Sequence, residues 1–376
     1  MEMKGRISRQ APKHARGRAP LRWLSIFPAL ASEHIPKDVM LLPGALTRSR
    51  RINQVDLVAK SPPPEAPKSG LRLIASRHPL WYLVLKSRDY DVLHLFHLKW
   101  ESVLLGLAFK LRNPRGRLYV KLDADAFIEQ QVSTRRRWRK PRVSDLVYIL
   151  ADRLSCETTT IYRLLIAKGW SQHKLLLLPN GIESDTRALL AAEKSARVQT
   201  ILTVGRLGTE QKNTERLIRS YGALPAHLRQ IWSLTLVGPI EPSHEQALRD
   251  LATSACCGGG EVNFVGRIAD RASLCELYGR ASIFVLPSRW ESSGLVLIEA
   301  LFAGLYSLAT PVGCAPDLLS DPQLGTLLPE EDSAFGVQLQ QALTIPRDPK
   351  AIKQRAARLV RDWDDIADTL IDAIII

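Results

Sequence analysis

Two glutamates, Glu291 and Glu299, stand eight positions apart in the stretch "RWESSGLVLIEALFAG". We expect a helix to begin near Gly294, and the residues around Glu299 are apolar on every side of it, so this helix should be packed all round. A buried carboxylate without hydrogen-bond donors is very costly. A vicinal diol such as a ribose would supply two donors. An arginine from a neighbouring element is the alternative partner.

The start of the same helix and two nearby cations suit an anion. The backbone N–H groups of Ser293, Gly294 and Leu295 are exposed there, and the helix dipole favours a negative charge such as phosphate. In "TVGRLGTEQKN", Arg206 follows a predicted strand and Lys212 comes six residues later. A planar guanidinium and a compact ammonium can grip different oxygens of a diphosphate. A solvated surface pair is the alternative.

Five apolar runs in the second half have the length and branching of buried strands: residues 200–204, 233–237, 262–265, 282–286 and 306–309. Segments with helical spacing lie between them. Repeated βαβ units predict an α/β fold with a parallel sheet covered on both faces, and ligands bind at the carboxyl ends of its strands. The glycines at Gly205 and Gly208 do not form the GxGxxG fingerprint, which argues against a nicotinamide cofactor.

The first half repeats this pattern less regularly, so we expect a second doubly wound domain. Predicted strands cover residues 21–27, 91–96, 117–122 and 174–179, and predicted helices cover 102–111 and 144–154. The predicted organisation is a basic tail over 1–20, a first domain over 21–183, a linker over 184–199, a second domain over 200–355 and a C-terminal helix over 356–376.

The motifs of the second half resemble the donor domain of glycosyltransferase family 4, of the bacterial polysaccharide and glycolipid type. They are "VGRL…KN", "LTLVGP", "VNFVGRI", "LYGRASIFVLPSRWESSGLVLIEALFAG" and "PVGCAPDLL". The paired glutamates, with seven residues between them, are the most diagnostic element. The resemblance implies a retaining, metal-independent hexosyltransferase with two Rossmann-like domains, the GT-B architecture, and an active site in the cleft between them. It implies no cofactor, because a UDP-, GDP- or ADP-sugar is the substrate.

Carried over residue by residue, the resemblance assigns the donor site. Arg206 and Lys212 would hold the diphosphate, Glu299 the ribose hydroxyls and Glu291 the hydroxyls of the transferred sugar. The backbone at Ser293, Gly294 and Leu295 would lie against the sugar and phosphate. Gly266 and Arg267 would border the base through backbone atoms. In this reading, Glu299 is buried in order to hold a nucleotide.

The candidates on the acceptor side are less sharply defined. "HIPKDVMLLPGALTRSR" stands where many family members have a glycine-rich loop, and Lys37 and Asp38 are its candidates, with an exposed ion pair as the alternative. In "YVKLDAD", Asp123 or Asp125 can face the cleft and take the acceptor proton, or can cap a helix instead. His97 lies nearer its strand end than His94 and is the better cleft candidate, although a structural histidine is the alternative.

The charge distribution indicates a polyanionic partner. The net charge is +14, and residues 1–183 carry 33 Lys and Arg against 15 Asp and Glu, whereas residues 184–376 carry 19 against 23. The first half therefore holds the whole basic excess, which suits an anionic membrane or nucleic acid. A basic cluster in that half would contact the membrane: Arg135, Arg136, Arg137, Trp138, Arg139, Lys140 and Arg142.

These features predict a cytoplasmic enzyme, peripheral on the inner face of the membrane, with a glycan or lipid-linked acceptor. No metal site is expected, and the leaving diphosphate would help to remove the acceptor proton in a front-face displacement. Another GT-B sugar-nucleotide enzyme, such as an epimerase or phosphorylase, remains an alternative. A nucleic-acid-binding protein is a further alternative, but only Trp138 offers a stacking group beside the basic residues.

Overall fold

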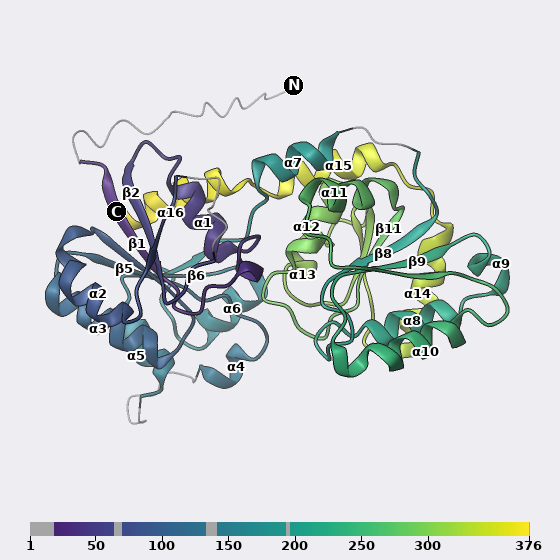
Figure 1. The fold of residues 1–376 in the computed structure, drawn as a ribbon, viewed down its shortest axis with the longest axis horizontal. Coiled ribbons are helices and arrows are strands. Elements are labelled where there is room, and N and C mark those ends of the chain that lie inside the picture. The colour runs from purple at the N-terminus through teal and green to yellow at the C-terminus, as the bar shows by residue number, and fades with distance from the viewer. Residues whose placement is uncertain (1–18, 64–69, 133–140, 193–195, 376) are drawn as a thin grey trace, which may run out of the picture.

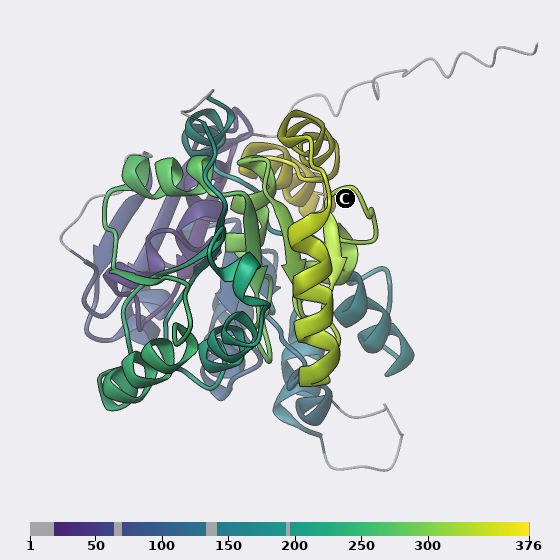
Figure 2. The same cartoon turned by 90° about the vertical axis from the view of Figure 1, so that its right-hand side faces the viewer.

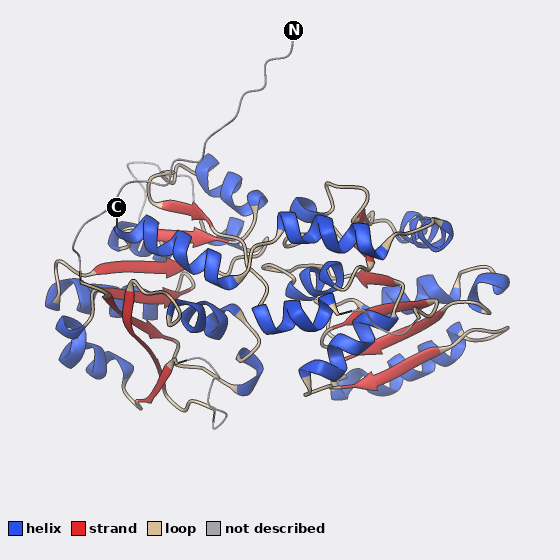
Figure 3. Ribbon diagram, turned by 90° about the horizontal axis from the view of Figure 1, so that it is seen from above, coloured by secondary structure: helices blue, strands red, loops and turns tan. Residues whose placement is uncertain are grey.

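The computed structural model describes residues 19–63, 70–132, 141–192 and 196–375 as two α/β domains (Figure 1). Each domain has one sheet of parallel strands with helices on both faces (Figure 3). The predicted pair of doubly wound domains is confirmed, as the resemblance to a GT-B enzyme implies.

The first domain contains a seven-stranded sheet of order β3-β2-β1-β4-β5-β6-β7. Its strands are β1 (Leu21–Ile26), β2 (Ile52–Ala59), β3 (Arg72–Ala75), β4 (Val92–Phe96), β5 (Arg117–Lys121), β6 (Arg153–Cys156) and β7 (Leu175–Leu177). Its helices are α1 (Asp38–Leu46), α2 (Pro79–Lys86), α3 (Trp100–Arg112), α4 (Ile128–Gln131), α5 (Val143–Leu150) and α6 (Thr159–Ala167), with short 3₁₀ turns at Ser32–His34 and Ser87–Asp89.

Every residue of the central strand β4 is buried, as expected for a strand covered on both faces. One apolar core forms between the sheet and helices α2, α3, α5 and α6. A separate core lies on the other face, beneath α1 and the C-terminal helix α16 (Trp363–Ile375). Both faces of the first sheet are therefore sealed, and its carboxyl edge is left to carry polar groups.

The second domain contains a six-stranded sheet of order β10-β9-β8-β11-β12-β13. Its strands are β8 (Thr200–Val204), β9 (Ser233–Val237), β10 (Val262–Gly266), β11 (Ile283–Leu286), β12 (Tyr306–Ala309) and β13 (Gly325–Leu327). Its helices are α7 (Ser184–Ala191), α8 (Thr214–Gly222), α9 (Ala226–Arg229), α10 (Glu245–Ala255), α11 (Arg271–Arg280), α12 (Leu295–Phe302), α13 (Ala315–Leu318), α14 (Asp332–Thr344) and α15 (Pro349–Leu359), with a 3₁₀ turn at Pro242–His244. Helix α14 lies on the outer side of this domain (Figure 2).

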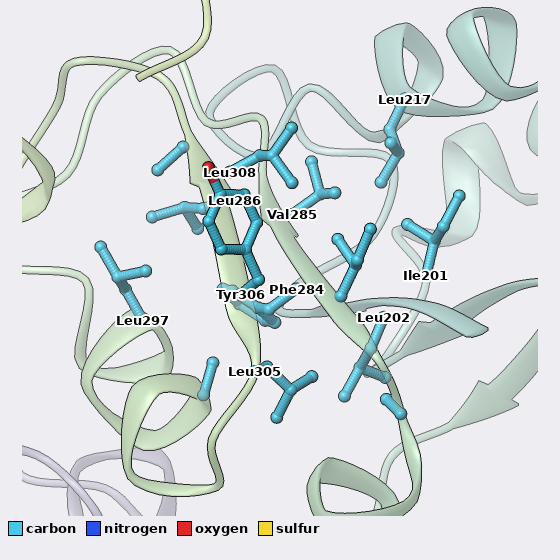
Figure 4. Close-up of a cluster of buried hydrophobic side chains, with 14 of the residues drawn as sticks. Ile201, Leu202, Leu217, Phe284, Val285, Leu286, Leu297, Leu305, Tyr306 and Leu308 are labelled. Atoms are coloured by element: carbon cyan, nitrogen blue, oxygen red, sulfur yellow. The ribbon is translucent and has the colours of Figure 1, made fainter. Parts of the chain in front are cut away.

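Helix α12, which carries Glu299, is packed between the sheet and other helices. Its Leu297 side chain lies in the core beside residues of β11 and β12 (Figure 4). On other sides α12 packs against α7 and α15. This arrangement explains why the segment is apolar nearly all round, as the sequence predicts.

Two segments cross between the domains and pair with each other. The Ile182 N–H donates to the Arg361 carbonyl at 3.2 Å, and the Trp363 N–H donates to the Ile182 carbonyl at 3.2 Å. Beyond this crossing, α16 returns to the first domain and packs against α1 (Figure 1). A buried stripe formed by Trp363, Ile366, Leu370 and Ile374 fixes it there.

Several predicted boundaries need correction. The predicted linker 184–199 begins with α7, which packs against α11 and α12, so α7 belongs to the second domain. The predicted C-terminal helix 356–376 is two helices, α15 and α16, because the chain is extended at Val360. The predicted helix 144–154 ends at Leu150, and its last two residues already belong to β6. Strands β2, β3, β6 and β13 were not predicted. Of the predicted tail 1–20, residues 1–18 lie outside the described part of the chain.

Candidate active site

The loops after β8 and β11 bring Lys212 and Glu291 into direct contact. The Lys212 Nζ atom contacts Glu291 Oε1, and the Ser288 hydroxyl donates to the same oxygen at 2.7 Å. Only 17% of the Lys212 side chain and 8% of the Glu291 side chain are exposed. Charges in such surroundings interact more strongly than charges in water. The two residues assigned to diphosphate and sugar therefore share one site.

Gln211, which the sequence analysis did not single out, links the loop after β8 to the loop after β11 by hydrogen bonds. Its backbone carbonyl accepts from the Arg289 N–H at 2.8 Å, and its side-chain Nε2 donates to the Trp290 carbonyl at 3.1 Å. Arg206 is exposed and donates to Gln211 Oε1 at 3.1 Å. Arg206 thus lies at the rim of the site that Lys212 and Glu291 form. Polar Gln211, between the predicted strand end and Lys212, is the only signal of this role in the sequence.

The turn before α12 is fixed by close backbone contacts. Gly294 has φ +83°, a left-handed conformation that glycine adopts without penalty. The Cys314 N–H donates to the Ser293 carbonyl at 2.8 Å, and a Cβ added to Gly313 would lie 2.6 Å from that carbonyl oxygen. Helix α12 begins directly after this turn at Leu295, so the N–H groups of Leu295 and Val296 precede the first helical acceptor, whereas the Leu297 N–H donates to the Gly294 carbonyl at 2.9 Å. These groups lie at the same sheet edge as Lys212 and Glu291.

Glu299 has an arginine partner, as the alternative interpretation of the sequence proposed. The Arg271 Nη2 atom contacts Glu299 Oε1, and Arg271 Nε donates to Thr186 Oγ1 at 3.1 Å. Burial works against the Arg271 charge, but the Glu299 carboxylate outweighs it and raises the pKa of Arg271. The Arg271 side chain is 34% exposed and the Glu299 side chain is 13% exposed. Tyr278 also hydrogen-bonds Glu299, so Arg271 and Tyr278 together supply protein partners for this carboxylate, and the ribose role stays a prediction.

Gly266 and Arg267 lie at the end of β10, the outermost strand on one side of the second sheet. Gly266 has φ +77° and no neighbour near the position of an added Cβ. Its carbonyl accepts from the Gly238 N–H at 2.9 Å, and Arg267 is exposed. The backbone is open here, two strands away from β8, so a flat group can approach it.

In the first domain, the buried Lys121 at the end of β5 lies next to two carboxylates. The Lys121 Nζ atom contacts Glu157 Oε1 and lies 3.1 Å from Asp38 Oδ2, and the Lys121 side chain is 1% exposed. Because the carboxylates are also buried, the pKa of Glu157 is raised to about 7 and that of Asp38 is raised as well. The alternative interpretation of Lys37 and Asp38 as an exposed ion pair is wrong, because Lys37 is exposed but Asp38 is buried against Lys121.

Glu157 also shapes the loop that carries Asp123. Its carboxylate accepts from the Asp123 N–H at 3.2 Å and from the Ala124 N–H at 3.3 Å. These bonds accompany a left-handed Asp123 with φ +44°, a conformation that costs free energy for a residue other than glycine. Lys121 and Glu157 were missed because their partners come from neighbouring strands and loops. The only signal was a charged residue at the end of an apolar run.

Three carboxylates in this cluster have a spacing that can hold a cation. Oxygens of Asp38, Asp123 and Glu157 lie within 4.8 Å of one another. The Lys121 ammonium already contacts two of them and supplies the positive charge that they need. A metal ion would have to enter beside that ammonium against its repulsion, so the donor set fits the lysine better than a metal.

A pocket of about 660 Å³ opens beside this loop in the first domain. Asp123, Asp125 and His97 line it together, and the other described lining residues also belong to the first domain. Burial lowers the pKa of His97, which favours its neutral form. His94, in contrast, is buried and shares a 3.1 Å hydrogen bond with Ser25, a structural role. The pocket therefore offers one imidazole and two carboxylates to a polyhydroxyl ligand.

The two domains contact each other near Asp125 and Glu291. The Thr159 N–H donates to Asp317 Oδ2 at 2.9 Å, and the rings of Phe127 and Trp290 meet edge to face with centroids 5.4 Å apart. Trp290 directly precedes Glu291, and Phe127 follows Asp125 by two residues. The contact therefore ties the loop that carries Asp125 and Phe127 to the loop that holds Glu291.

A small cleft of about 160 Å³ between the domains contains polar atoms that lack partners. Asn180 and Ser293 line it, along with Glu157 and Asp317. Within the described residues, Asn180 Oδ1 and Ser293 Oγ are buried without a hydrogen-bond partner. Unpaired buried polar atoms are rare and costly, which marks this cleft as a place for a polar ligand.

Of the predicted membrane-contact cluster, the structure describes Arg142. Residues 133–140 lie outside the described residues, and they include Arg135, Arg136, Arg137, Trp138, Arg139 and Lys140. Arg142 is described, donates to the Gln130 carbonyl at 2.7 Å and lines the 660 Å³ pocket.

Comparison with known proteins agrees with this geometry. Residues 190–359 match the family described as "Glycosyl transferases group 1". The matched region contains Arg206, Lys212, Glu291 and Glu299, so the group 1 signature covers the donor-side candidates. This match covers less than half of the chain and agrees with the resemblance that the sequence motifs show.

Relatives of this group differ in how much of the chain they share. The serotype-specific mannosyltransferase WbdA of Escherichia coli is 31% identical over 109 residues, which are 29% of this chain and 13% of WbdA. The D-inositol 3-phosphate glycosyltransferase of Acidothermus cellulolyticus is 26% identical over 335 residues, covering 83% of this chain and 71% of that protein. The structure of Anabaena HepE in complex with UDP and glucose matches 94% of this chain and 99% of its own, with a TM-score of 0.68 and 14% identity. The last likeness establishes the fold.

Proposed function

We propose that the protein is a retaining glycosyltransferase of family 4 that transfers a sugar from a nucleoside-diphosphate sugar to a glycan or lipid-linked acceptor. The observation that carries this proposal is the Lys212 and Glu291 pair, next to Arg206 and the start of α12, at the carboxyl edge of the second sheet. Ligands of open α/β sheets bind at this edge. The bound UDP and glucose of the similarly folded HepE support a nucleotide-sugar donor.

The donor would lie across the loops after β8 and β11. Lys212 has three N–H donors, so one can stay on Glu291 while the others reach phosphate oxygens. Arg206, exposed at the rim, would close on the diphosphate in place of its bond to Gln211. Glu291 would accept from sugar hydroxyls, and Glu299 from the ribose. Gly266 and Arg267 would border the base.

The chemistry then depends on charge stabilisation. As the bond between sugar and diphosphate breaks, negative charge grows on the leaving group, where Lys212, Arg206 and the first-turn N–H groups of α12 would stabilise it. In the proposed front-face displacement, the diphosphate takes the acceptor proton. Asp123 would orient the acceptor hydroxyl from the facing domain. No metal ion is required for these steps.

We further propose that the acceptor lies in the pocket beside Asp123 and that the enzyme works on the inner face of the membrane. None of the helices among the described residues is long and apolar enough to span a bilayer. The charge of the first half, 33 basic against 15 acidic residues, supports contact with anionic lipid. The basic residues 135–142 remain the predicted contact.

Release of nucleoside diphosphate tests the proposal. Purified protein is incubated with UDP-, GDP- and ADP-sugars, with and without a bacterial glycolipid extract as acceptor. Release that requires both one donor and the acceptor supports a transferase. Conversion of the donor sugar without an acceptor would instead indicate the epimerase-like alternative.

A further inference from the structure

Helices α2 and α3 present large apolar side chains to solvent. We name Trp81, Leu85, Trp100, Leu104, Leu107 and Leu111 the α2–α3 ridge. Their exposed fractions run from 44% to 75%. The two helices pack against each other on the same face of the first sheet, with α5 next to α3 (Figure 1). The ridge residues lie on the outward side, because the inward residues of α3, such as Phe109, are buried in the core.

The spacing on α3 shows that the ridge is a continuous stripe. Trp100, Leu104, Leu107 and Leu111 follow one another at intervals of four, three and four residues, which places them on one side of a helix. The buried Leu105 and Phe109 lie on the opposite side of the helix. Helix α3 is therefore apolar on both its core side and its solvent side. Large apolar patches on a soluble surface commonly mark a docking site for a protein or a membrane.

The charges around the ridge favour an anionic bilayer as its occupant. Between Arg77 and Arg115 the chain carries seven Lys and Arg against three Asp and Glu. Lys99 and Arg112, at the two ends of α3, are exposed. A second copy of the chain packed about a two-fold axis would bring these positive charges together, which is unfavourable. Anionic headgroups instead attract basic residues, and tryptophan prefers the headgroup level.

The ridge also leads to the pocket of the first domain. Lys99 and Trp100, at the start of α3, line the 660 Å³ pocket, as do Arg142 and Val143 at the start of α5. Asp123 and His97 line the same pocket. A membrane seated on the ridge would therefore meet the pocket mouth at Trp100.

We propose that the α2–α3 ridge docks on the surface of an anionic phospholipid bilayer, so that the pocket beside Asp123 receives the polar head of a lipid-linked acceptor from that bilayer. The docking surface consists of described residues and includes none of residues 135–140. The acceptor part of this proposal rests on the proposed function, whereas the docking part does not.

Vesicle flotation of the full chain tests the docking. We use phosphatidylcholine vesicles, either pure or with about a third phosphatidylglycerol, and add no donor sugar. The parent is expected to float with the anionic vesicles. A variant with Leu104→Gln, Leu107→Gln and Leu111→Gln should lose bound fraction by about tenfold or more, because apolar burial and charge act together in interfacial binding.

A matched control removes three exposed apolar side chains from the second domain. Ile231, Val337 and Ile345 are 54%, 55% and 44% exposed, and their replacement by Gln should leave flotation unchanged. Both variants change solvent-exposed positions, so their thermal unfolding should match that of the parent. Equal flotation of the parent and the ridge variant would overturn the proposal. Sedimentation velocity tests for a dimer. If the parent does not bind vesicles but forms a dimer that is absent in the ridge variant, the membrane proposal is overturned and the ridge binds a second copy of the chain.

The same variants separate docking from catalysis. Nucleotide affinity should be equal in the parent and the ridge variant, because the ridge lies on the first domain. Transfer to a lipid-linked acceptor in anionic vesicles should fall with the bound fraction. If flotation depends on the ridge but no donor is ever turned over, the proposed function fails while the docking surface stands.

Discussion

Glu299 has an ion-pair partner in the fold and a predicted partner in the nucleotide, and the two roles can be separated by substituting each half of the pair. Glu299→Ala removes the carboxylate and leaves Arg271 with its bond to Thr186. Arg271→Ala leaves the carboxylate in place. We predict that only Glu299→Ala strongly weakens nucleotide binding.

The magnitudes follow from burial and hydrogen bonding. Breaking a fully buried ion pair costs about 3–5 kcal/mol and an exposed pair at most about 1 kcal/mol. With Arg271 34% exposed and Glu299 13% exposed, each variant should lose roughly 1–3 kcal/mol of unfolding free energy. A hydrogen bond to a charged group contributes about 1.5–3 kcal/mol, so losing the ribose contacts should weaken binding by about a hundredfold or more.

Isothermal titration of each variant with UDP, GDP and ADP measures nucleotide affinity. Urea unfolding measures the free energy of unfolding. Arg271→Ala should bind the preferred nucleotide within about tenfold of the parent, since ribose hydroxyls can donate to the freed carboxylate. If both variants lose affinity equally and in proportion to their lost stability, Glu299 acts through the fold and the ribose assignment is refuted.

Other perturbations test further parts of the site. Arg206→Ala and Lys212→Ala should each lower turnover by about a hundredfold, as removal of one donor to a developing charge does, and EDTA should leave turnover unchanged; loss in EDTA that manganese restores would contradict this. Because burial raises the pKa of Glu157 from its ordinary 4.5 to about 7, the folded state binds more protons than the unfolded state in this window, so stability should fall as pH rises through it. Urea titrations should show that Glu157→Gln flattens this slope, and an unchanged slope would mean that another group causes it. Gly313→Ala should lower both nucleotide affinity and turnover, because the added Cβ would push on the Ser293 carbonyl and shift the start of α12; titration and turnover values equal to those of the parent would refute this role of the turn.

The strands of the second domain could be predicted closely from its sequence, because most of them are unbroken apolar runs bounded by polar residues, glycine or proline. Strand β2 shows why the first domain was harder. Its run is interrupted by Asn53, Gln54 and Asp56, yet Asp56 is fully buried. Arg72 Nε on the neighbouring strand donates to Asp56 Oδ1 at 2.8 Å, and this partner depends on strand pairing that the local sequence does not reveal.

The same limit applies to the candidate site. Lys212 and Glu291 were assigned to one donor site through the family resemblance, and the structure adds that their side chains are in direct contact. That Glu299 needs a partner was also predictable, but Arg271 could not be chosen among the arginines without the packing of α11 on α7 beside α12. Lys121 and Glu157 are neighbours only because β5 pairs with β6. Burial of a charge indicates that a partner exists, and topology decides which one.

Transfer of labelled sugar to an acceptor tests the central claim most directly. The parent and Lys212→Ala are incubated with a radiolabelled nucleotide sugar and a glycolipid acceptor in anionic vesicles, and label is counted in the lipid fraction. The account predicts label covalently attached to the acceptor by the parent and about a hundredfold less by Lys212→Ala. Label that remains in the donor, or appears only as free or epimerised sugar at equal rates with both proteins, would contradict it.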